Sequence, residues 1–333
     1  MAVMSPRQWA LTAVVLAIML ALPLVLPAFW LSGILGRSLV YGIVALSLTF
    51  LASYGGFISL AQTMIAGVAG YTVAILAPTA IPASSSALSY WLAMPAALVA
   101  ATVAGGVIGL IAVRTRDIYL LMITLALAVG FSLFAQSNID WFNGYEGIRN
   151  ILGPDIFGYP FRTHLVFYYV SLTVAALLYL LVLYVVRTPF GLTLQGIRDN
   201  PRRVSALGFD VALHRVAAFA LAGFIAGCGG VLITFYNIGI TPSSIGMTAT
   251  VNVLVMSVIG GLGHPIGAFI GAVIFSLMDT FAATVYDRNR FNTLIGLVFL
   301  VIVLVSPDGV LGFGKRLLFW RKPKAREEQT GTH

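Results

Sequence analysis

Charged side chains are scarce in this sequence. Asp, Glu, Lys and Arg together make up 9% of the 333 residues, against about 25% in an average soluble domain. None occurs from Leu39 to Val113, and none from Val216 to Met278. Hydrophobic residues make up 59% of the chain, and a spanning helix needs about 20 of them in succession. The composition therefore excludes a soluble protein and predicts an all-α, polytopic membrane protein with several spans in each uncharged window.

The groups that enzymes and ion-coupled carriers use are also missing. The single cysteine, Cys228, permits no disulfide within the chain. No metal-ligand spacing links the four histidines, His164, His214, His264 and His333. No paired carboxylates occur at membrane depth, where ion-coupled carriers place ionisable groups. We therefore predict no catalytic residues, no metal and no bound cofactor, with the energy for any transport coming from outside this chain.

Two glycine-rich stretches approach nucleotide-binding motifs without completing them. Gly309 to Arg316, GVLGFGKR, matches a phosphate loop as far as the lysine, but Arg316 stands where a Ser or Thr would bind magnesium. Residues 260–267, GGLGHPIG, have Ile266 in place of the third glycine of a dinucleotide fingerprint. Neither motif predicts a nucleotide site. No soluble basic face remains for nucleic acid, so the net charge of +8 indicates basic residues at membrane edges.

The apolar segments predict about ten crossings of the membrane. In chain order they are Trp9 to Trp30, Ile34 to Leu51, 54 to 76, Leu88 to Val113, Ile118 to Gln136, Leu165 to Val186, Val216 to Tyr236, Ala249 to Leu262, Ile266 to Phe281 and Asn292 to Val305. The seventh contains AGCGG, a small-residue surface that favours close helix packing. Together they form a single transmembrane domain, 1–315, followed by a basic tail, 316–333.

Two glycine-rich interruptions fall in opposite halves of the chain. The first contains Gly55 and Gly56, and the second contains Gly260, Gly261 and Gly263. Irregular backbone at membrane depth is tolerated inside protein or along a cavity, and paired interrupted segments indicate a transport pathway. The candidate pathway residues are the polar groups in or near interrupted apolar segments: Gln62, Thr63, Thr124, Asn252 and His264. The alternative role for each is that of a satisfied packing residue.

The distribution of basic residues predicts the orientation. With both termini in the cytoplasm, fourteen of the nineteen Lys and Arg residues lie on the cytoplasmic side, as the positive-inside rule requires. The segment 137–163 is then the longest outer loop. The segment from Arg187 to Arg215 is a cytoplasmic loop that carries five arginines.

This cytoplasmic loop has signals of internal order. Asn200 suits a helix cap, Pro201 suits the first turn, and Gly208 suits the end, with φ > 0. They predict a helix of about two turns from Pro201 to Leu207, with Val204 and Leu207 on one side. Arg202 and Arg203 fall in its first turn, where the helix dipole disfavours cations. Either lipid phosphate or an acidic groove on a cytoplasmic partner must favour them.

An ordered set of motifs, covering about residues 40–315, resembles the LivM-type permease subunit of branched-chain amino-acid ABC transporters. The set comprises SLAQTMIAGVAGYTVAIL, ITLALA, GYEGI, TPFGLTLQGIRDNPRRVSALGFDV, AFALAGFIAGCGGVL, GITPSS, VIGGLGHPIGAFIGA and SPDGVLGF. Permeases for urea, short amides or other small solutes are similar. One departure is Pro201, because such loops have a non-proline residue at this position.

The resemblance implies a set of partners in a bacterial inner membrane. They are a homologous second permease, two ATP-binding subunits that use ATP and magnesium, and a periplasmic solute-binding protein. The 187–215 loop would then couple to the ATPase through Arg198, Asp199, Asn200, Arg202, Arg203 and Gly208. Two other classes stay open: a self-sufficient secondary carrier or channel, and a membrane scaffold without a pore.

Overall fold

The computed structural model describes residues 19–285, except 25, 81–87, 116, 156 and 157, together with residues 296, 297, 300, 309, 310 and 312. Most of the predicted first span, most of the predicted last span and the basic tail 316–333 lie outside the described residues. The location of the two termini, on which the predicted orientation depends, lies outside them too.

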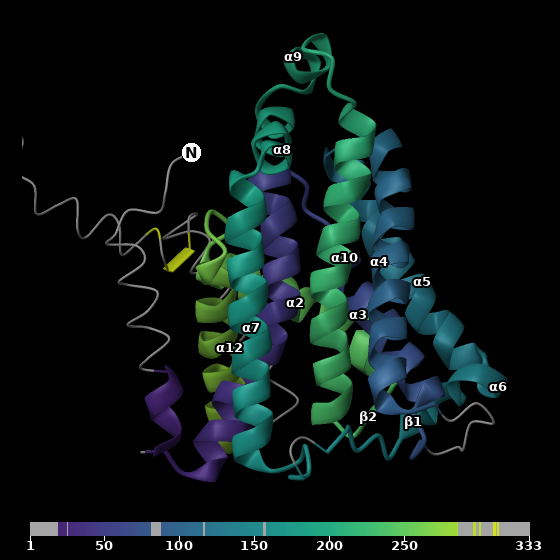
Figure 1. The fold of residues 1–333 in the computed structure, drawn as a ribbon, viewed down its shortest axis with the longest axis vertical. Coiled ribbons are helices and arrows are strands. Elements are labelled where there is room, and N and C mark those ends of the chain that lie inside the picture. Colours follow the sequence, from purple (N-terminus) through teal and green to yellow (C-terminus); the bar gives the residue numbers. More distant parts are fainter. Residues whose placement is uncertain are drawn as a thin grey trace, which may run out of the picture.

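The described residues form a bundle of helices that run roughly parallel or antiparallel to one another (Figure 1). The helices are η1 Leu22–Leu24, η2 Phe29–Gly36, α2 Arg37–Phe50, η3 Leu51–Gly55, α3 Gln62–Leu76, α4 Tyr90–Arg114, α5 Asp117–Ser137, α6 Ile139–Phe142, η4 Gly144–Glu146, α7 His164–Arg187, α8 Pro189–Asp199, α9 Pro201–Ala206, α10 Val211–Tyr236, η5 Pro242–Ile245, α11 Met247–Gly260 and α12 Ile266–Val285. Two two-residue strands, β1 Ile148–Arg149 and β2 Gly239–Ile240, pair antiparallel. The helix α9 lies at one end of the bundle and the strands at the other, here called the α9 end and the strand end.

Six helices among the described residues are long and apolar enough to cross a membrane. They are Phe29–Gly55, Tyr90–Arg114, Ile118–Ser137, His164–Arg187, Val211–Tyr236 and Pro242–Gly260. Two shorter apolar helices, Gln62–Leu76 and Ile266–Phe281, accompany them. The prediction of an all-α, polytopic membrane protein is confirmed.

The boundary between the first two predicted spans, of which one ends at Trp30 and the other begins at Ile34, is wrong. Helix is continuous from Phe29 to Gly55, through a π-helical start and a π-helical end. The prolines Pro23 and Pro27 precede this helix, and proline rather than Ser32-Gly33 interrupts helical hydrogen bonding. In the second half, the short span predicted at Ala249 is extended to full length by η5, which begins at Pro242.

Helix α10 is the centre of the bundle, because it packs against α2, α3 and α4. The contact surface is made of glycines. A Cβ at Gly223 would lie 2.6 Å from the Ala101 carbonyl oxygen of α4, and one at Gly230 would lie 2.0 Å from the Ala66 carbonyl oxygen of α3. This confirms AGCGG as a close-packing surface. Without a hydrophobic driving force between helices in lipid, such backbone approach supplies much of the association energy.

An ion pair joins α2 to α12 within the bundle. The Arg37 guanidinium contacts the Asp279 carboxylate, and the two side chains are 31% and 26% exposed. Arg37 also lies over the Tyr41 ring, 5.7 Å from its centroid. The partly buried charge of Arg37 is therefore compensated by a carboxylate, which explains why an arginine is tolerated here.

Removing one partner of this pair is expected to destabilise the protein. Asp279→Ala leaves the Arg37 charge uncompensated, and we expect a loss of about 2 kcal/mol, less than a fully buried pair because both groups are partly exposed. Thermal unfolding in detergent measures this loss. The double variant Arg37→Met with Asp279→Leu removes both charges and is expected to recover most of the stability. Equal stability of the Asp279→Ala variant and the wild type would show that the pair contributes nothing.

Candidate coupling surface and transport pathway

Two short helices occupy the α9 end of the bundle, between α7 and α10 (Figure 1). The first, α8, was not predicted from the sequence. Thr188 caps it by accepting a hydrogen bond from the Gly191 amide (3.5 Å), and Pro189 occupies its first turn. Gly191, Leu194 and Ile197 form its buried face. The Thr-Pro start and this spacing are ordinary helix signals and could have identified α8.

The second helix, α9, agrees with the predicted segment. The Asn200 side chain caps it by accepting a hydrogen bond from the Arg203 amide (3.2 Å), and Pro201 is its first residue. Gly208 has φ = 88°, which confirms the predicted left-handed conformation. Asn200 and Gly208 therefore shape the loop locally, by a cap and by a turn.

The prediction that Val204 and Leu207 share one side is wrong. Val204 is 7% exposed and packs over Gly196 of α8, whereas Leu207 is 76% exposed. Of the two residues, Val204 alone is covered by α8, whereas Leu207 follows the last residue of α9 and is open to solvent. The helix α9 lies at the tip of the bundle (Figure 1). Arg202 and Arg203 on α9, and Leu207 and Phe209 just after it, are exposed. This exposed set of apolar and basic side chains is called the α9 surface below.

The remaining loop residues, Arg198 and Asp199, end α8. They form an ion pair with each other at 3.1 Å. Arg198 also donates a hydrogen bond to the carbonyl oxygen of Ser53, at the end of the Phe29–Gly55 helix. The Arg198 side chain is thus anchored to the bundle rather than carried on the α9 surface.

Two predicted pathway residues lie in a buried polar cluster between α2, α3 and α11. Gln62 is 1% exposed and accepts a hydrogen bond from the Ser47 hydroxyl (3.0 Å). Thr63 is 6% exposed, and its hydroxyl lies 2.6 Å from that of Thr250. The Gln62 Nε2 atom has no hydrogen-bond partner within the described part of the chain. Sequence reasoning missed Ser47 and Thr250, because their contacts join residues 15 and 187 positions apart in the chain and depend on how the helices pack.

The other three predicted pathway residues are dispersed. Thr124 is buried on α5 and accepts a hydrogen bond from the Leu60 amide (3.1 Å), so it holds the segment before α3. Asn252 is half-buried on α11. His264 is exposed in the turn between α11 and α12. The structure therefore brings Gln62, Thr63 and Thr124 to the same end of α3, whereas Asn252 lies on α11 and His264 in the turn that follows it.

The glycine-rich interruptions both lie at helix ends. Gly55 is the last residue of η3, and Gly56 follows it with φ = 71°. Gly260 is the last residue of α11, and Gly261 follows with φ = 106°. Gly263 is exposed and has no atom within 4 Å of a built Cβ. Each interruption thus ends one helix before an irregular segment leads into the next, α3 or α12.

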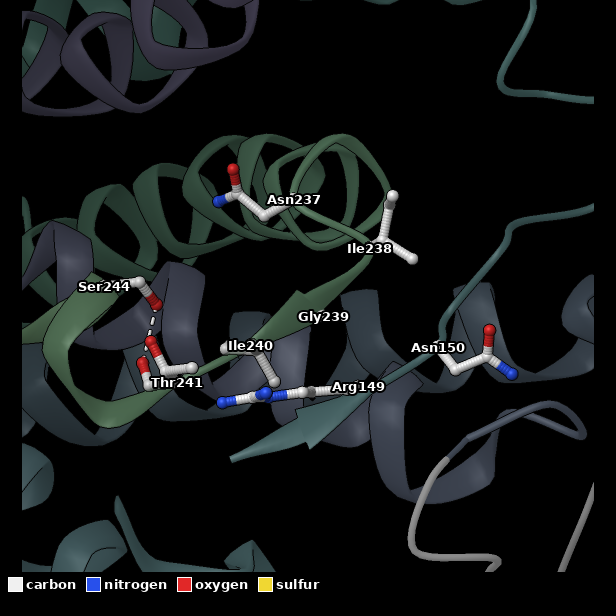
Figure 2. A pocket seen from close by; sticks show the side chains of 8 residues that line it. All are labelled: Arg149, Asn150, Asn237, Ile238, Gly239, Ile240, Thr241 and Ser244. Atoms are coloured by element: carbon white, nitrogen blue, oxygen red, sulfur yellow. Dashed lines mark hydrogen bonds between the residues drawn. The ribbon is translucent and has the colours of Figure 1, made fainter. Parts of the chain in front are cut away.

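An open pocket of about 480 Å³ lies at the strand end (Figure 2). Residues of the paired strands β1 and β2, with Arg149 opposite Gly239, line it. Ile238 has φ = 57°, a strained conformation for a β-branched residue. Ile240 and Ser244 line both this pocket and a narrow cavity that reaches Thr63. The pocket at the strand end and the cavity that reaches Thr63 of the polar cluster therefore have two lining residues in common.

Comparison with known proteins identifies the family. A family described as "Branched-chain amino acid transport system / permease component" matches residues 30–305. The chain belongs to this family. It is a permease component of an ABC transport system, a transport subunit rather than an enzyme. Such subunits bind no cofactor, and ATP is hydrolysed by partner subunits. ATPase and binding-protein partners are part of the system.

Several curated relatives cover most of the chain. The branched-chain amino acid permease LivM of Salmonella typhimurium is 24% identical, over 88% of this chain and 72% of its own length. The corresponding LivH of Escherichia coli is 24% identical, over 84% and 89%. The ribose import permease RbsC of Haemophilus influenzae is 25% identical, over 85% and 85%. No solved structure matches the chain.

Proposed function

We propose that this chain forms half of the solute pathway of an importer for branched-chain amino acids. It pairs with a second, homologous permease in a bacterial inner membrane, with two ATP-binding subunits below and a periplasmic solute-binding protein above. In this arrangement the chain has ten crossings, the α9 end faces the cytoplasm and the strand end faces the periplasm. The similarity to both LivM and LivH supports a paired permease.

The observation that carries the proposal is the two-sided construction of the loop 187–215. One side, α8, is packed into the bundle through Gly191, Leu194 and Ile197. The other side, the α9 surface, is exposed at the tip of the bundle. A capped, ordered helix with one face anchored and one face free is suited to receive a partner and pass its movement to the bundle. We assign the ATPase contact to Arg202 and Arg203, and the shaping of the loop to Arg198, Asp199, Asn200 and Gly208.

We place the solute route beside the polar cluster of Gln62 and Thr63. In the closed bundle these hydroxyl and amide groups form hydrogen bonds with one another. When the helices separate, the same groups can form hydrogen bonds with a polar solute, which needs such partners at membrane depth. Thr124, Asn252 and His264 are proposed to line the route on either side of this cluster. The Gln62 Nε2 atom, which has no acceptor among the described residues, supports the assignment, because a buried amide donor is costly to leave without an acceptor.

ATP-dependent uptake tests the proposed function. Proteoliposomes that contain this chain, its second permease and the two ATP-binding subunits are loaded with ATP, and the binding protein is added outside with labelled leucine. Uptake is expected only with ATP and only with all subunits. Uptake by this chain alone without ATP would establish a carrier or channel instead. Unchanged ATP-driven uptake after omission of this chain would show that it is a scaffold.

The same assay identifies the solute class. Leucine, isoleucine and valine are expected to compete with labelled leucine, whereas urea, acetamide and ribose are not. Ribose is included because the relative RbsC is a ribose import permease. Saturable uptake of ribose, urea or acetamide in place of leucine would assign the chain to another solute within the same transport family.

A further inference from the structure

One arginine of the loop 187–215 points into the bundle rather than toward a partner. Arg198 donates a hydrogen bond from Nη1 to the Ser53 carbonyl oxygen at 2.5 Å, across 145 positions of the chain. Ser53 belongs to η3, the π-helical last turn of the Phe29–Gly55 helix. Arg198 therefore connects α8 to the helix end at which the first glycine-rich interruption begins.

The bond has a clear physical basis. The last carbonyls of a helix have no partner within the helix, and a cation near a helix C-terminus is favoured by the helix dipole. Arg198 supplies both the donor and the charge. Its stem lies against Gly56, where a Cβ would be 2.6 Å from Arg198 Cγ. The absence of a side chain at Gly56 makes room for the arginine, in addition to allowing φ = 71°.

The same serine reaches the second interruption. The Ser53 hydroxyl donates a hydrogen bond to the carbonyl oxygen of Leu262, across 209 positions of the chain. Leu262 lies in the irregular segment between α11 and α12, next to Gly261 with φ = 106°. A continuous series of hydrogen bonds thus runs from Arg198 through Ser53 to Leu262. It is called the Ser53 junction below.

We propose that Arg198 is a positioning residue that transmits movement of α8 and α9 to both interruptions at once through the Ser53 junction. The inference rests on the proposed function and refines it: Arg198 serves transmission, whereas Arg202 and Arg203 serve docking. When the ATPase displaces α8, Arg198 pulls on the end of the Phe29–Gly55 helix, and Ser53 carries that displacement to the segment that leads into α12. The segments 57–61 and 261–265, which follow the Phe29–Gly55 helix and α11, then move together.

The test separates transmission from docking in the complete reconstituted complex. Arg198→Gln removes the charge and the close contact with Ser53 but keeps a polar side chain. We expect the ATPases to co-purify as with the wild type and ATP hydrolysis to continue, while leucine molecules transported per ATP fall about tenfold, as loss of one charge-assisted hydrogen bond predicts. Arg198→Lys, which keeps the charge, is expected to recover part of this ratio. Arg162→Gln, an exposed residue of the outer loop, is the matched control and is expected to leave the ratio unchanged.

A second variant tests the other half of the junction. Ser53→Ala keeps the carbonyl that accepts from Arg198 and removes only the hydroxyl that donates to Leu262. We expect the same loss of transport per ATP, with unchanged ATPase association and a small fall in melting temperature from the lost hydrogen bond. An unchanged ratio in Arg198→Gln and Ser53→Ala would overturn the inference, as would loss of ATPase association in Arg198→Gln. ATP-independent uptake by the wild-type complex would instead refute the proposed function, so the two failures are distinguishable.

Discussion

Replacing Gly260 with alanine is expected to prevent the protein from folding, whereas the same change at Gly263 is expected to have no effect. A Cβ at Gly260 would lie 1.7 Å from the Gly267 carbonyl oxygen and 2.9 Å from the Gly271 amide nitrogen. These are backbone atoms, so no side-chain rotation relieves the overlap and α11 must separate from α12. The α12 side of this contact is equally tight, because a Cβ at Gly271 would lie 1.8 Å from the Met256 carbonyl oxygen of α11. Gly263 has nothing within 4 Å.

The expected cost at Gly260 is above about 4 kcal/mol, which is a large share of the stability of a typical domain. Membrane yield and gel-filtration profiles of a fluorescent fusion, followed by thermal unfolding in detergent, measure the outcome. Gly263→Ala is expected to match the wild type in all three. A Gly260→Ala protein with normal yield and melting temperature would show that the α11–α12 contact does not hold the fold together.

This matched pair also shows what could be predicted from the sequence. Residues 260–267 predicted an interruption, because glycine density signals one. Which glycine lies against another helix depends on the path of α12, and no local pattern encodes that path. The number and placement of apolar helices were predictable for the opposite reason, since lipid exposure imposes length and hydropathy on each span separately.

The candidate site shows the same division. The α9 helix was predictable because its cap, its proline and its terminal glycine, Asn200, Pro201 and Gly208, all lie within one short segment of the chain. The contacts that hold the candidate site together join residues that are far apart in the sequence. Thr63 meets Thr250 across 187 positions, and Arg198 meets Ser53 across 145. Sequence reasoning placed Arg198 in the correct loop but could not determine which way its side chain points.

The α9 surface can contact either lipid phosphate or a protein partner, and charge reversal on this surface is expected to distinguish the two. Arg202 and Arg203 lie in the first turn of α9, where the helix dipole disfavours them. Leu207, which is 76% exposed, and Phe209, which is 46% exposed, follow α9 directly in the chain. The described structure gives neither arginine an ion pair. A protein groove that combines acidic and apolar groups would satisfy all four residues, and we favour it over the bilayer because α9 lies at the tip of the bundle, beyond the ends of α7 and α10 (Figure 1).

The double variant Arg202→Glu with Arg203→Glu is therefore expected to release the ATP-binding subunits and to abolish leucine uptake, while the chain remains folded in the membrane. Reversing two charges opposite an acidic groove replaces attraction by repulsion, and we expect ATPase affinity to fall at least about a hundredfold. Titration of purified ATPase onto the permease in nanodiscs, made once with neutral and once with anionic lipid, measures this. Arg149→Glu at the strand end is the matched control and is expected to leave ATPase affinity unchanged. If the variant binds the ATPase normally and loses only its preference for anionic lipid, the arginines face the bilayer, because lipid phosphate would then be their sole partner.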